Sequence, residues 1–581
     1  MFCFLVFIEI WDILPVRKIM RTILKKEFNL LDEPWVKVMQ QDTSIKTVSL
    51  PNAIIHAHEY SGLAGEMRAQ DIAILRLMEA VLITAFYKVD VDGNENPIET
   101  PDDALDRWED LWKQGKFPET VIRNYLSQWH DRFWLFHPER PFMQSLNMQK
   151  ATQNKASKLI GNLSKSGNVD RLRLFVCRTG EEAESVSYAE AARWLLFLNG
   201  FDDCAVKISD PNAKARKKGV SRAYLGPLGM IYPKGKTLFE TLMLNMKLLT
   251  DKEEIWKENR PVWEEENPRD IEQYPVACPN NLPDLYTFNS RLILLYREKG
   301  RVTGYSIKGG SWFDNVNAFT EPMTLWQYSP ENKKKGQSAY WFPQSHMAEK
   351  QLWRDFNIAF VKDAINRRPG SVEWIETLKK NNVLDRKKYT SFQAVGIRYD
   401  VNQSSSITDS IDDIVTLHTT LLGEAVNEGW RRRIAEEIAT CDKISSELYV
   451  LTKNSYLAAG ANESIATAKS KKSTALWYDA INQPFRKWLR SLSPNSSQIC
   501  GDNFKTIDQF IEEWQKSART IALKLGREIV NQVGEKAYFG RIVNEKSGSK
   551  IVEKRYSSAK SFSDFCHNVY ANYPKITEVC E

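Results

Sequence analysis

The residue pattern of this chain changes near residue 400, and this change limits the folds that it can adopt. Between residues 28 and 396, short strand-like runs such as 47–50 and 291–296 alternate with amphipathic stretches such as 70–87 and 188–198. After residue 406 the strand signals fade, and helical spacing appears in the stretches 407–422, 428–451, 474–490, 506–533 and 558–573. Long helices joined by polar loops favour an antiparallel bundle. The sequence therefore predicts an α+β fold, in which a large mixed N-terminal domain over 28–403 precedes a helical bundle domain over 404–581.

Length and composition agree with two or three globular domains. A chain of 581 residues is too long for one hydrophobic core, and 42% hydrophobic residues are enough to form several. The 80 basic residues nearly balance the 74 acidic ones, so the net charge of +6 does not by itself indicate a nucleic-acid partner. The eight cysteines stand singly, without the close pairs of a zinc site or a disulfide scaffold, which indicates a reducing cytoplasm.

The chain opens with an apolar run that differs from a signal peptide. Residues 2–14 contain Glu9 and Asp12, and no basic segment precedes them. We interpret residues 1–27 as an N-terminal extension, in which residues 1–19 are an upstream extension of the reading frame and Met20 is the native start. No later run approaches the roughly 20 apolar residues that span a membrane, so we expect a cytoplasmic protein without membrane contact.

Three basic clusters stand out from the balanced average. Residues 150–178 hold seven basic residues and one acid, residues 211–236 hold seven and none, and residues 453–490 hold seven and two. Such clusters neutralise phosphates and give affinity without sequence preference, although solvated surface loops have the same composition. The candidate phosphate contacts are Lys214, Arg216, Lys217, Lys218, Lys471 and Lys472.

No familiar catalytic pattern is present. The chain lacks a GxSxG elbow, a P-loop, a GxGxxG turn after a strand and an HExxH helix. His56 and His58 form the closest histidine pair, and on a strand their spacing would put both rings on one face. No cysteine or aspartate stands near them to complete a metal site. The sequence therefore predicts no catalytic residue, no metal and no cofactor.

Five short segments are informative through their order and spacing. They are NLLDEPW at 29–35, HPERPFMQ at 137–144, LFETLMLN at 238–245, YTFNSR at 286–291 and EPMTLW at 321–326. Together they resemble the CasA family, the large subunit of the type I-E CRISPR surveillance complex (Cascade), from about residue 28 to the C-terminus.

The resemblance implies a non-enzymatic subunit whose C-terminal domain is an antiparallel four-helix bundle. In the CasA family this subunit recognises the PAM, the short motif beside a DNA target, starts opening of the duplex and recruits a helicase-nuclease. The implied partners are the CRISPR guide RNA, double-stranded target DNA, the helicase-nuclease and the other Cascade subunits. Those subunits are the small-subunit dimer, the backbone subunits and the guide-end-capping subunit.

The resemblance also implies roles for five residues. Lys308 resembles the family's lysine that enters the minor groove, and Asn402 with Gln403 resembles the wedge that parts the first base pairs. Phe175 resembles the aromatic residue of a loop that meets neighbouring subunits and guide RNA. Cys177 lies in the same loop, where one family pattern has an asparagine.

The residues alone leave other interpretations open. Asn402 and Gln403 also fit a linker before the first helix of the bundle, with Ser406 or Asp409 as its cap. The alternatives to a PAM-reading subunit are an RNA-processing nuclease with scattered acids and lysines, and a general RNA-binding scaffold.

Overall fold

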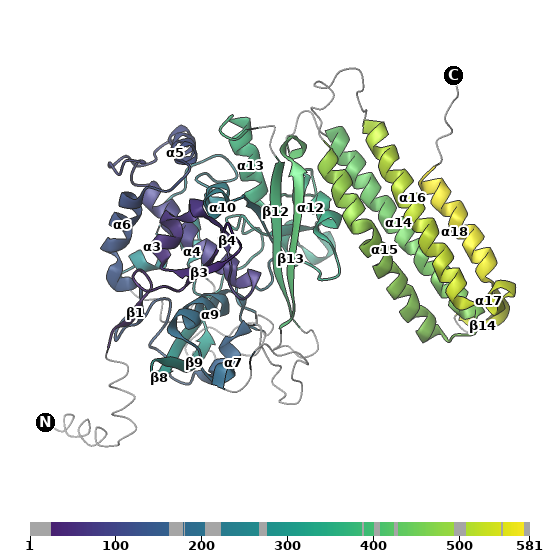
Figure 1. The fold of residues 1–581 in the computed structure, drawn as a ribbon, viewed down its shortest axis with the longest axis horizontal. Coiled ribbons are helices and arrows are strands. Elements are labelled where there is room, and N and C mark those ends of the chain that lie inside the picture. Colours follow the sequence, from purple (N-terminus) through teal and green to yellow (C-terminus); the bar gives the residue numbers. More distant parts are fainter. Residues whose placement is uncertain are drawn as a thin grey trace. The chain divides into compact units, whose positions relative to one another are not determined.

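The chain forms two compact units (Figure 1). The mixed unit comprises Met1–Lys350, Ile358–Asp385 and Ser391–Ile414, and the helical unit comprises Gln351–Asn357, Arg386–Thr390 and Val415–Glu581. The computed structural model describes residues 25–161, 178, 181–203, 222–258, 260–266, 276–385, 389–399, 407–422, 428–492, 507–547 and 550–574. The expected boundary between residues 403 and 404 stays a prediction.

The mixed unit combines small sheets with helices of very different lengths. Its helices are α3 (Leu50–Ile55), α4 (Arg68–Phe86), α5 (Pro101–Gln114), α6 (Glu119–Gln128), α7 (Ala156–Leu159), α8 (Glu181–Glu184), α9 (Tyr188–Phe201), α10 (Leu238–Asn245), α11 (Leu282–Tyr286) and α13 (Gly370–Lys380). Helix α12 (Phe356–Phe360) has residues in both units. The strands are β1 (Glu27–Asn29), β2 (Val36–Gln40), β3 (Ile45–Val48), β4 (Tyr60–Leu63), β5 (Trp134–Phe136), β6 (Thr152–Lys155), β7 (Met230–Lys234), β8 (Arg291–Glu298), β9 (Arg301–Gly309), β10 (Leu325–Ser329), β11 (Tyr340–Gln344), β12 (Tyr389–Tyr399) and β13 (Ile407–His418). Strands β12 and β13 each have residues in both units.

Three-stranded sheets recur in this unit, in the orders β3-β2-β4, β6-β9-β8 and β13-β12-β7. The pairs β2 with β3, β2 with β4, β6 with β9, β8 with β9 and β7 with β12 are antiparallel. Antiparallel pairing in separate small sheets, with helices between them, confirms the predicted α+β class.

Helix α4 forms the centre of the mixed unit. Every residue from Ala69 to Phe86 is buried, so the helix is apolar nearly all round, as expected for a core helix. It packs against α6, α9, α10 and α11. The predicted helices 70–87 and 188–198 correspond to α4 and α9, and the predicted strand 291–296 lies within β8.

Strands β12 and β13 form a long hairpin, which corrects the expected helix over 407–422. The Thr408 hydroxyl donates a hydrogen bond to the Arg398 oxygen at 3.2 Å, and Gln393 Nε2 donates to the Asp413 oxygen at 3.0 Å. These contacts run in opposite directions along the two strands, so the strands are antiparallel. The connecting residues 400–406, with Asn402 and Gln403, lie outside the described residues. They join two strands, so the expected linker before a helix capped by Ser406 or Asp409 is wrong.

The helical unit is built on four long helices. They are α14 (Glu428–Ala458), α15 (Glu463–Ser491), α16 (Ile507–Val533) and α18 (Ser558–Asn572). Helix α14 packs against the other three, α15 packs against α16, and α16 packs against α18. Large aromatic side chains such as Trp477, Phe485 and Trp514 fill the interior. This confirms the predicted C-terminal antiparallel four-helix bundle.

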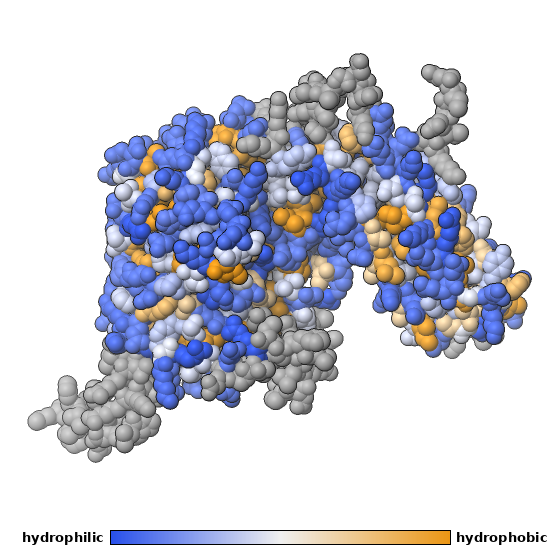
Figure 2. Space-filling model, viewed as in Figure 1, coloured by the Kyte–Doolittle hydropathy of each residue, from blue (hydrophilic) through white to orange (hydrophobic). Residues whose placement is uncertain are grey.

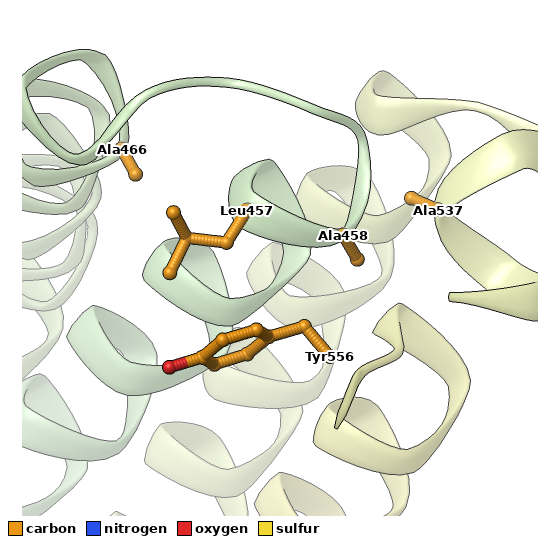
Figure 3. Packing of buried hydrophobic residues seen from close by; sticks show 5 residues of the cluster. All are labelled: Leu457, Ala458, Ala466, Ala537 and Tyr556. Atoms are coloured by element: carbon orange, nitrogen blue, oxygen red, sulfur yellow. The ribbon is translucent and has the colours of Figure 1, made fainter. Parts of the chain in front are cut away.

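A short helix and a hairpin between α16 and α18 were not expected from the sequence. Helix α17 (Glu535–Phe539) is followed by the antiparallel strands β14 (Arg541–Ser547) and β15 (Lys550–Tyr556). Ala537 of α17 and Tyr556 of β15 pack with Leu457, Ala458 and Ala466, which lie at the turn between α14 and α15 (Figure 3). This apolar cluster holds the hairpin onto the bundle.

The surface in view is mainly hydrophilic, with scattered apolar patches (Figure 2). In the described residues, no helix has both the length and the apolar character needed to cross a membrane.

Candidate nucleic-acid interface

Tyr399 ends β12 immediately before segment 400–406, and three groups fix its side chain. Its hydroxyl donates a hydrogen bond to the main-chain oxygen of Phe201 at 2.7 Å, and the Arg222 guanidinium lies 4.9 Å from the centre of its ring. A Cβ on Gly226 would lie 2.8 Å from the hydroxyl oxygen, so this close approach requires glycine. The start of segment 400–406 is therefore held beside the C-terminal end of α9.

Segment 204–221 contains four of the candidate phosphate contacts, Lys214, Arg216, Lys217 and Lys218. It lies outside the described residues, but the residues on both sides of it are described. The Ala223 N–H donates to the Asp202 oxygen at 3.1 Å, and the Leu225 N–H donates to the Gly200 oxygen at 2.8 Å. These hydrogen bonds bring the two ends of the basic segment together, next to Tyr399.

A buried ion pair joins the C-terminal end of α9 to the sheet β6-β9-β8. Nε of Arg291, the first residue of β8, donates to Oδ2 of Asp202 at 2.6 Å, and Arg291 is buried. The main-chain N–H of Arg291 donates to Oδ1 of Asn199 at 3.1 Å. Because Arg291 pairs with Gly309 of β9, the end of α9 and the end of β9 are held together.

Lys308 precedes Gly309 at this end of β9. The residue is 3% exposed, and Nζ donates to the main-chain oxygen of Asn147 at 3.1 Å. The expected role, entry into a DNA groove, would need a lysine that reaches solvent. Lys308 can reach a groove only when its ammonium exchanges the Asn147 oxygen for a new acceptor.

Phe175 and Cys177 lie in segment 162–177, outside the described residues. Residues near both ends of this segment contact α9. A Cβ on Gly161 would collide with the Phe197 ring, and Arg178 forms an ion pair with Glu190. The segment thus leaves and rejoins the described structure beside the same helix that carries Phe201 at its end.

Acidic side chains lie beside the β12–β13 hairpin. Glu66, Asp71, Asp409 and Asp412 line a cavity of about 480 Å³, with Arg68 as its described basic side chain. Burial raises the pKa of Asp71 to about 6, against the opposing effects of the Gly65 N–H and Arg68. The cavity includes residues 407–410 and 412 of β13, directly after segment 400–406, so this acidic wall repels phosphates from that side of the hairpin.

The three segments expected to bind nucleic acid thus leave the mixed unit around the C-terminal end and one side of α9. A family model described as CRISPR-associated protein Cse1 matches residues 29–525. The chain belongs to this family. This confirms the resemblance to CasA expected from the sequence.

Relatives and solved structures of the Cse1 family agree with this assignment. The CasA/Cse1 protein of Thermus thermophilus is 33% identical over 242 residues, which span 41% of this chain and 42% of that relative. The crystal structure of Thermobifida fusca Cse1 has a TM-score of 0.76 and 25% identity, and the match covers 95% of this chain and 99% of that one. A chain of a solved CRISPR RNA-guided surveillance complex has a TM-score of 0.65 and 16% identity, over 94% of this chain and all of that one.

In this member of the Cse1 family, the motif at 321–326 organises a buried polar network. Both carboxylate oxygens of Glu321 accept hydrogen bonds from Arg76 at 2.9 Å. The Tyr224 hydroxyl donates to the same carboxylate at 2.6 Å, and the Met323 N–H does so at 3.0 Å. Glu321 therefore joins α4 to the segment that follows residue 221.

The motifs at 29–35 and 137–144 also have structural roles. Nε1 of Trp35 donates to the Leu30 oxygen at 2.9 Å. Nδ1 of His137 accepts the N–H groups of Glu139 and Arg140 at 3.0 and 2.9 Å. These motifs thus supply hydrogen bonds within the mixed unit.

His56 and His58 do not share a strand face, which corrects the sequence-based expectation. His56 follows α3, and His58 lies in the 3-10 helix Ala57–Glu59. Both rings approach Glu59. No group of three or more potential metal ligands occurs in the part of the chain that the structure describes.

Lys471 and Lys472 lie on α15 in the helical unit, and both are exposed. Their phosphate contacts stay a prediction. Sequence reasoning did not predict the positioning roles of Tyr399, Phe201 and Asp202, and the motif at 286–291 did not indicate that its Arg291 pairs with Asp202.

Proposed function

We propose that this chain is the large subunit of a type I-E RNA-guided surveillance complex that recognises the PAM of double-stranded DNA and opens the adjacent base pairs. It would also help to recruit the helicase-nuclease. The observation that carries the proposal is the contact of Tyr399 with Phe201, because it holds the start of segment 400–406 beside the ends of the basic segment 204–221. Family membership supports the same role.

In this proposal the basic segment and Lys308 engage the duplex before any base pair breaks. Lys214, Arg216, Lys217 and Lys218 neutralise phosphates without reading sequence. Lys308 reaches acceptors in the minor groove, where the pattern is degenerate and a flexible lysine tolerates several PAM sequences. Phe175 and the loop that holds Cys177 meet guide RNA and neighbouring subunits.

Asn402 and Gln403 then act as the wedge. Opening a base-pair step costs roughly 1–2 kcal/mol, and an amide side chain can hydrogen-bond the edge of the unpaired base. The β12–β13 hairpin supports this role, since a wedge must keep its position while the duplex is forced apart. Two paired strands of 11 and 12 residues provide a firmer base for Asn402 and Gln403 than a linker would.

The decisive experiment compares a chain carrying both Asn402→Ala and Gln403→Ala with the unmodified chain in the assembled complex. We expect initial PAM binding to stay nearly intact, while formation of the guide–target hybrid slows on linear duplex. The defect should fade on negatively supercoiled DNA or on a duplex with a mismatched bubble beside the PAM. Ser404→Ala with Ser405→Ala, in the same segment, is the control. Equal impairment on bubble and linear duplex would contradict the wedge.

Two further assays separate this proposal from its alternatives. Cleavage of RNA by the isolated chain with a divalent metal would favour an RNA-processing nuclease. Tight binding of guide RNA by the isolated chain, without binding of a PAM duplex, would favour a general RNA-binding scaffold.

A further inference from the structure

The part of the helical unit formed by α17 and the β14–β15 hairpin exposes large apolar side chains. The exposed fractions are 57% for Tyr538, 74% for Phe539 and 61% for Ile542. In Figure 2, apolar atoms lie beside hydrophilic ones at the end of the bundle where Figure 1 labels α17 and β14. Exposed aromatic residues in a well-packed structure are typical of a binding surface.

The backbone of α17 is fixed, so its aromatic residues are held outward. Ala537 is fully buried in the apolar cluster with Leu457 and Tyr556 (Figure 3). The neighbouring Tyr538 and Phe539 are exposed. The Ser557 hydroxyl donates to the Tyr538 oxygen at 2.8 Å, and Arg555 donates to the Phe539 oxygen at 3.3 Å. These contacts reduce the conformational entropy that a ligand would have to remove.

The ends of α14 and α15 contribute to the same surface. A Cβ on Gly460, in the turn between these helices, would lie 2.8 Å from Nη1 of Arg541. Lys469 of α15 lies 5.7 Å from the centre of the Tyr456 ring, which packs against the same apolar cluster as Tyr556. We call this surface, formed by residues 453–472, 535–543 and 553–556, the bundle tip.

The bundle tip is basic. Residues 453–472 contain four basic residues and one acid, and residues 535–543 and 553–556 together contain four basic residues and two acids. The acid of the first stretch, Glu463, is paired with Lys453 at 2.6 Å. Lys469, Arg541 and Arg555 are exposed, and none of them forms an ion pair with another described residue.

We propose that the bundle tip binds single-stranded nucleic acid. Bases stack on exposed aromatic rings whatever their sequence, while neighbouring cations neutralise the backbone phosphates. Tyr538 and Phe539 supply the rings, and Lys469, Arg541 and Arg555 supply the charges. A duplex hides its base faces, so the tip prefers single strands. The charge excess favours this occupant over a protein surface, which would need matching acids.

This site is independent of the proposed PAM function. It uses none of Lys308, Asn402 and Gln403, and it lies within the helical unit. Failure of single-strand binding at the bundle tip would therefore not contradict the PAM proposal. Failure of the PAM proposal would not contradict single-strand binding at the tip.

The first test measures binding of a fluorescein-labelled oligothymidylate to the full-length chain by anisotropy. Tyr538→Ala with Phe539→Ala should weaken binding about tenfold, the loss expected when a base loses its stacking partner. Tyr570→Ala, an exposed tyrosine near the other end of α18, is the matched control and should change affinity less than twofold. Binding of a blunt duplex should be unaffected by either change.

The second test locates the contact and its charges. Photocrosslinking with an oligonucleotide that carries 5-iodouracil should yield adducts in the peptide that contains Tyr538 and Phe539. Lys469→Gln with Arg541→Gln should flatten the slope of log affinity against log salt by about one to two units. Lys46→Gln with Lys252→Gln removes the same charge from the mixed unit and should leave the slope nearly unchanged.

Three results would overturn the proposal. They are crosslinks confined to other peptides, an aromatic double variant that binds oligothymidylate within twofold of the unmodified chain, and a loss of affinity for a Cascade protein subunit with single-strand binding unchanged. The last result would make the tip a protein-docking surface. Thermal melting of each variant checks that the bundle remains folded.

Discussion

The hydroxyl of Tyr399 donates a hydrogen bond to the main-chain oxygen of Phe201 at 2.7 Å, across 198 residues of sequence. Tyr399 is the last residue of β12, and Phe201 is the last residue of α9. Tyr399 immediately precedes segment 400–406, which contains Asn402 and Gln403. Phe201 lies three residues before segment 204–221, which contains Lys214, Lys217 and Lys218. One hydrogen bond thus ties the proposed wedge to the proposed phosphate-binding segment.

Tyr399→Phe tests this connection. The change removes the hydroxyl and leaves the buried Phe201 oxygen without that donor, at a cost of about 1–3 kcal/mol. We expect slower formation of the guide–target hybrid on linear duplex by the assembled complex, with recovery on DNA that carries a bubble beside the PAM. Tyr389→Phe, at the opposite end of the same strand, is the control. Identical rates for Tyr399→Phe and the unmodified chain would show that the hydrogen bond does not position the wedge.

Glu321→Gln tests the buried network around α4. The substitution keeps the shape of the side chain but leaves the Arg76 charge buried without its carboxylate, which typically costs about 3–5 kcal/mol. We expect a clearly lower urea midpoint for unfolding of the mixed unit. Glu349→Gln, which breaks an exposed pair with Arg398, should cost about 0–1 kcal/mol. Similar midpoints for the two variants would argue against a structural role for Glu321.

Glu79→Gln tests a buried acid in α4. Burial raises the pKa of Glu79 well above 4.5, and neither carboxylate oxygen has a described hydrogen-bond partner. Above about pH 4.5 the unfolded chain loses this proton while the folded chain keeps it, so stability falls by about 1.4 kcal/mol per pH unit until the folded pKa is reached.

The glutamine is neutral at every pH, so the variant should lose this dependence. We expect its gain in urea midpoint over the unmodified chain to be larger at about pH 8 than at about pH 6. Glu33→Gln, at an exposed position, should show no such trend. A gain that is the same at both pH values would mean that Glu79 has the same protonation in the folded and unfolded chains.

The sequence predicted the long helices well because their apolar spacing is unambiguous. The strand Ile407–His418 was mistaken for a helix for a specific reason. Its buried positions are mainly odd-numbered, but Asp409 and Asp413 occupy two of the odd positions. The other odd positions hold Ile407, Ile411, Val415 and Leu417, and the first three of these are four apart, which imitates a helix. The β-branched content of the segment was the signal that could have corrected this.

The β14–β15 hairpin carried a signal that was overlooked. Ile542 and Val543, and then Ile551 and Val552, flank the turn Ser-Gly-Ser at 547–549, which is typical of two short strands around a glycine turn. The positioning contacts of the nucleic-acid interface had no such signal. Arg291 and Asp202 are 89 residues apart, and only the folded chain brings them together.

Replacing Lys214, Lys217 and Lys218 together by Ala tests the basic segment. Each phosphate contact that is lost should flatten the slope of log affinity against log salt by about one unit, to at most about three. Binding of a PAM duplex by the assembled complex over a range of salt concentrations measures the slope. The control is a variant in which three exposed lysines elsewhere in the mixed unit are replaced by Ala: Lys46, Lys116 and Lys252. An unchanged slope in the first variant would mean that the three lysines make no phosphate contacts and that segment 204–221 is a solvated surface.

Lys308→Ala and Lys308→Met test the groove contact. In the structure the ammonium donates to the Asn147 oxygen, so binding DNA exchanges one acceptor for another and gains affinity only if the groove acceptor is the better one. A groove contact contributes to the duplex alone. Both variants should therefore weaken binding of a PAM duplex by the assembled complex, by less than the roughly 10- to 100-fold of a full charged hydrogen bond because the Asn147 contact is given up. They should weaken binding of an already unwound target much less. Methionine keeps the buried stem of the side chain, so agreement between the two variants excludes a cavity as the cause. Two outcomes would contradict the groove contact: equal losses of affinity for duplex and unwound target, or duplex binding by Lys308→Met that matches the unmodified chain. Either would mean that Lys308 has only a structural role.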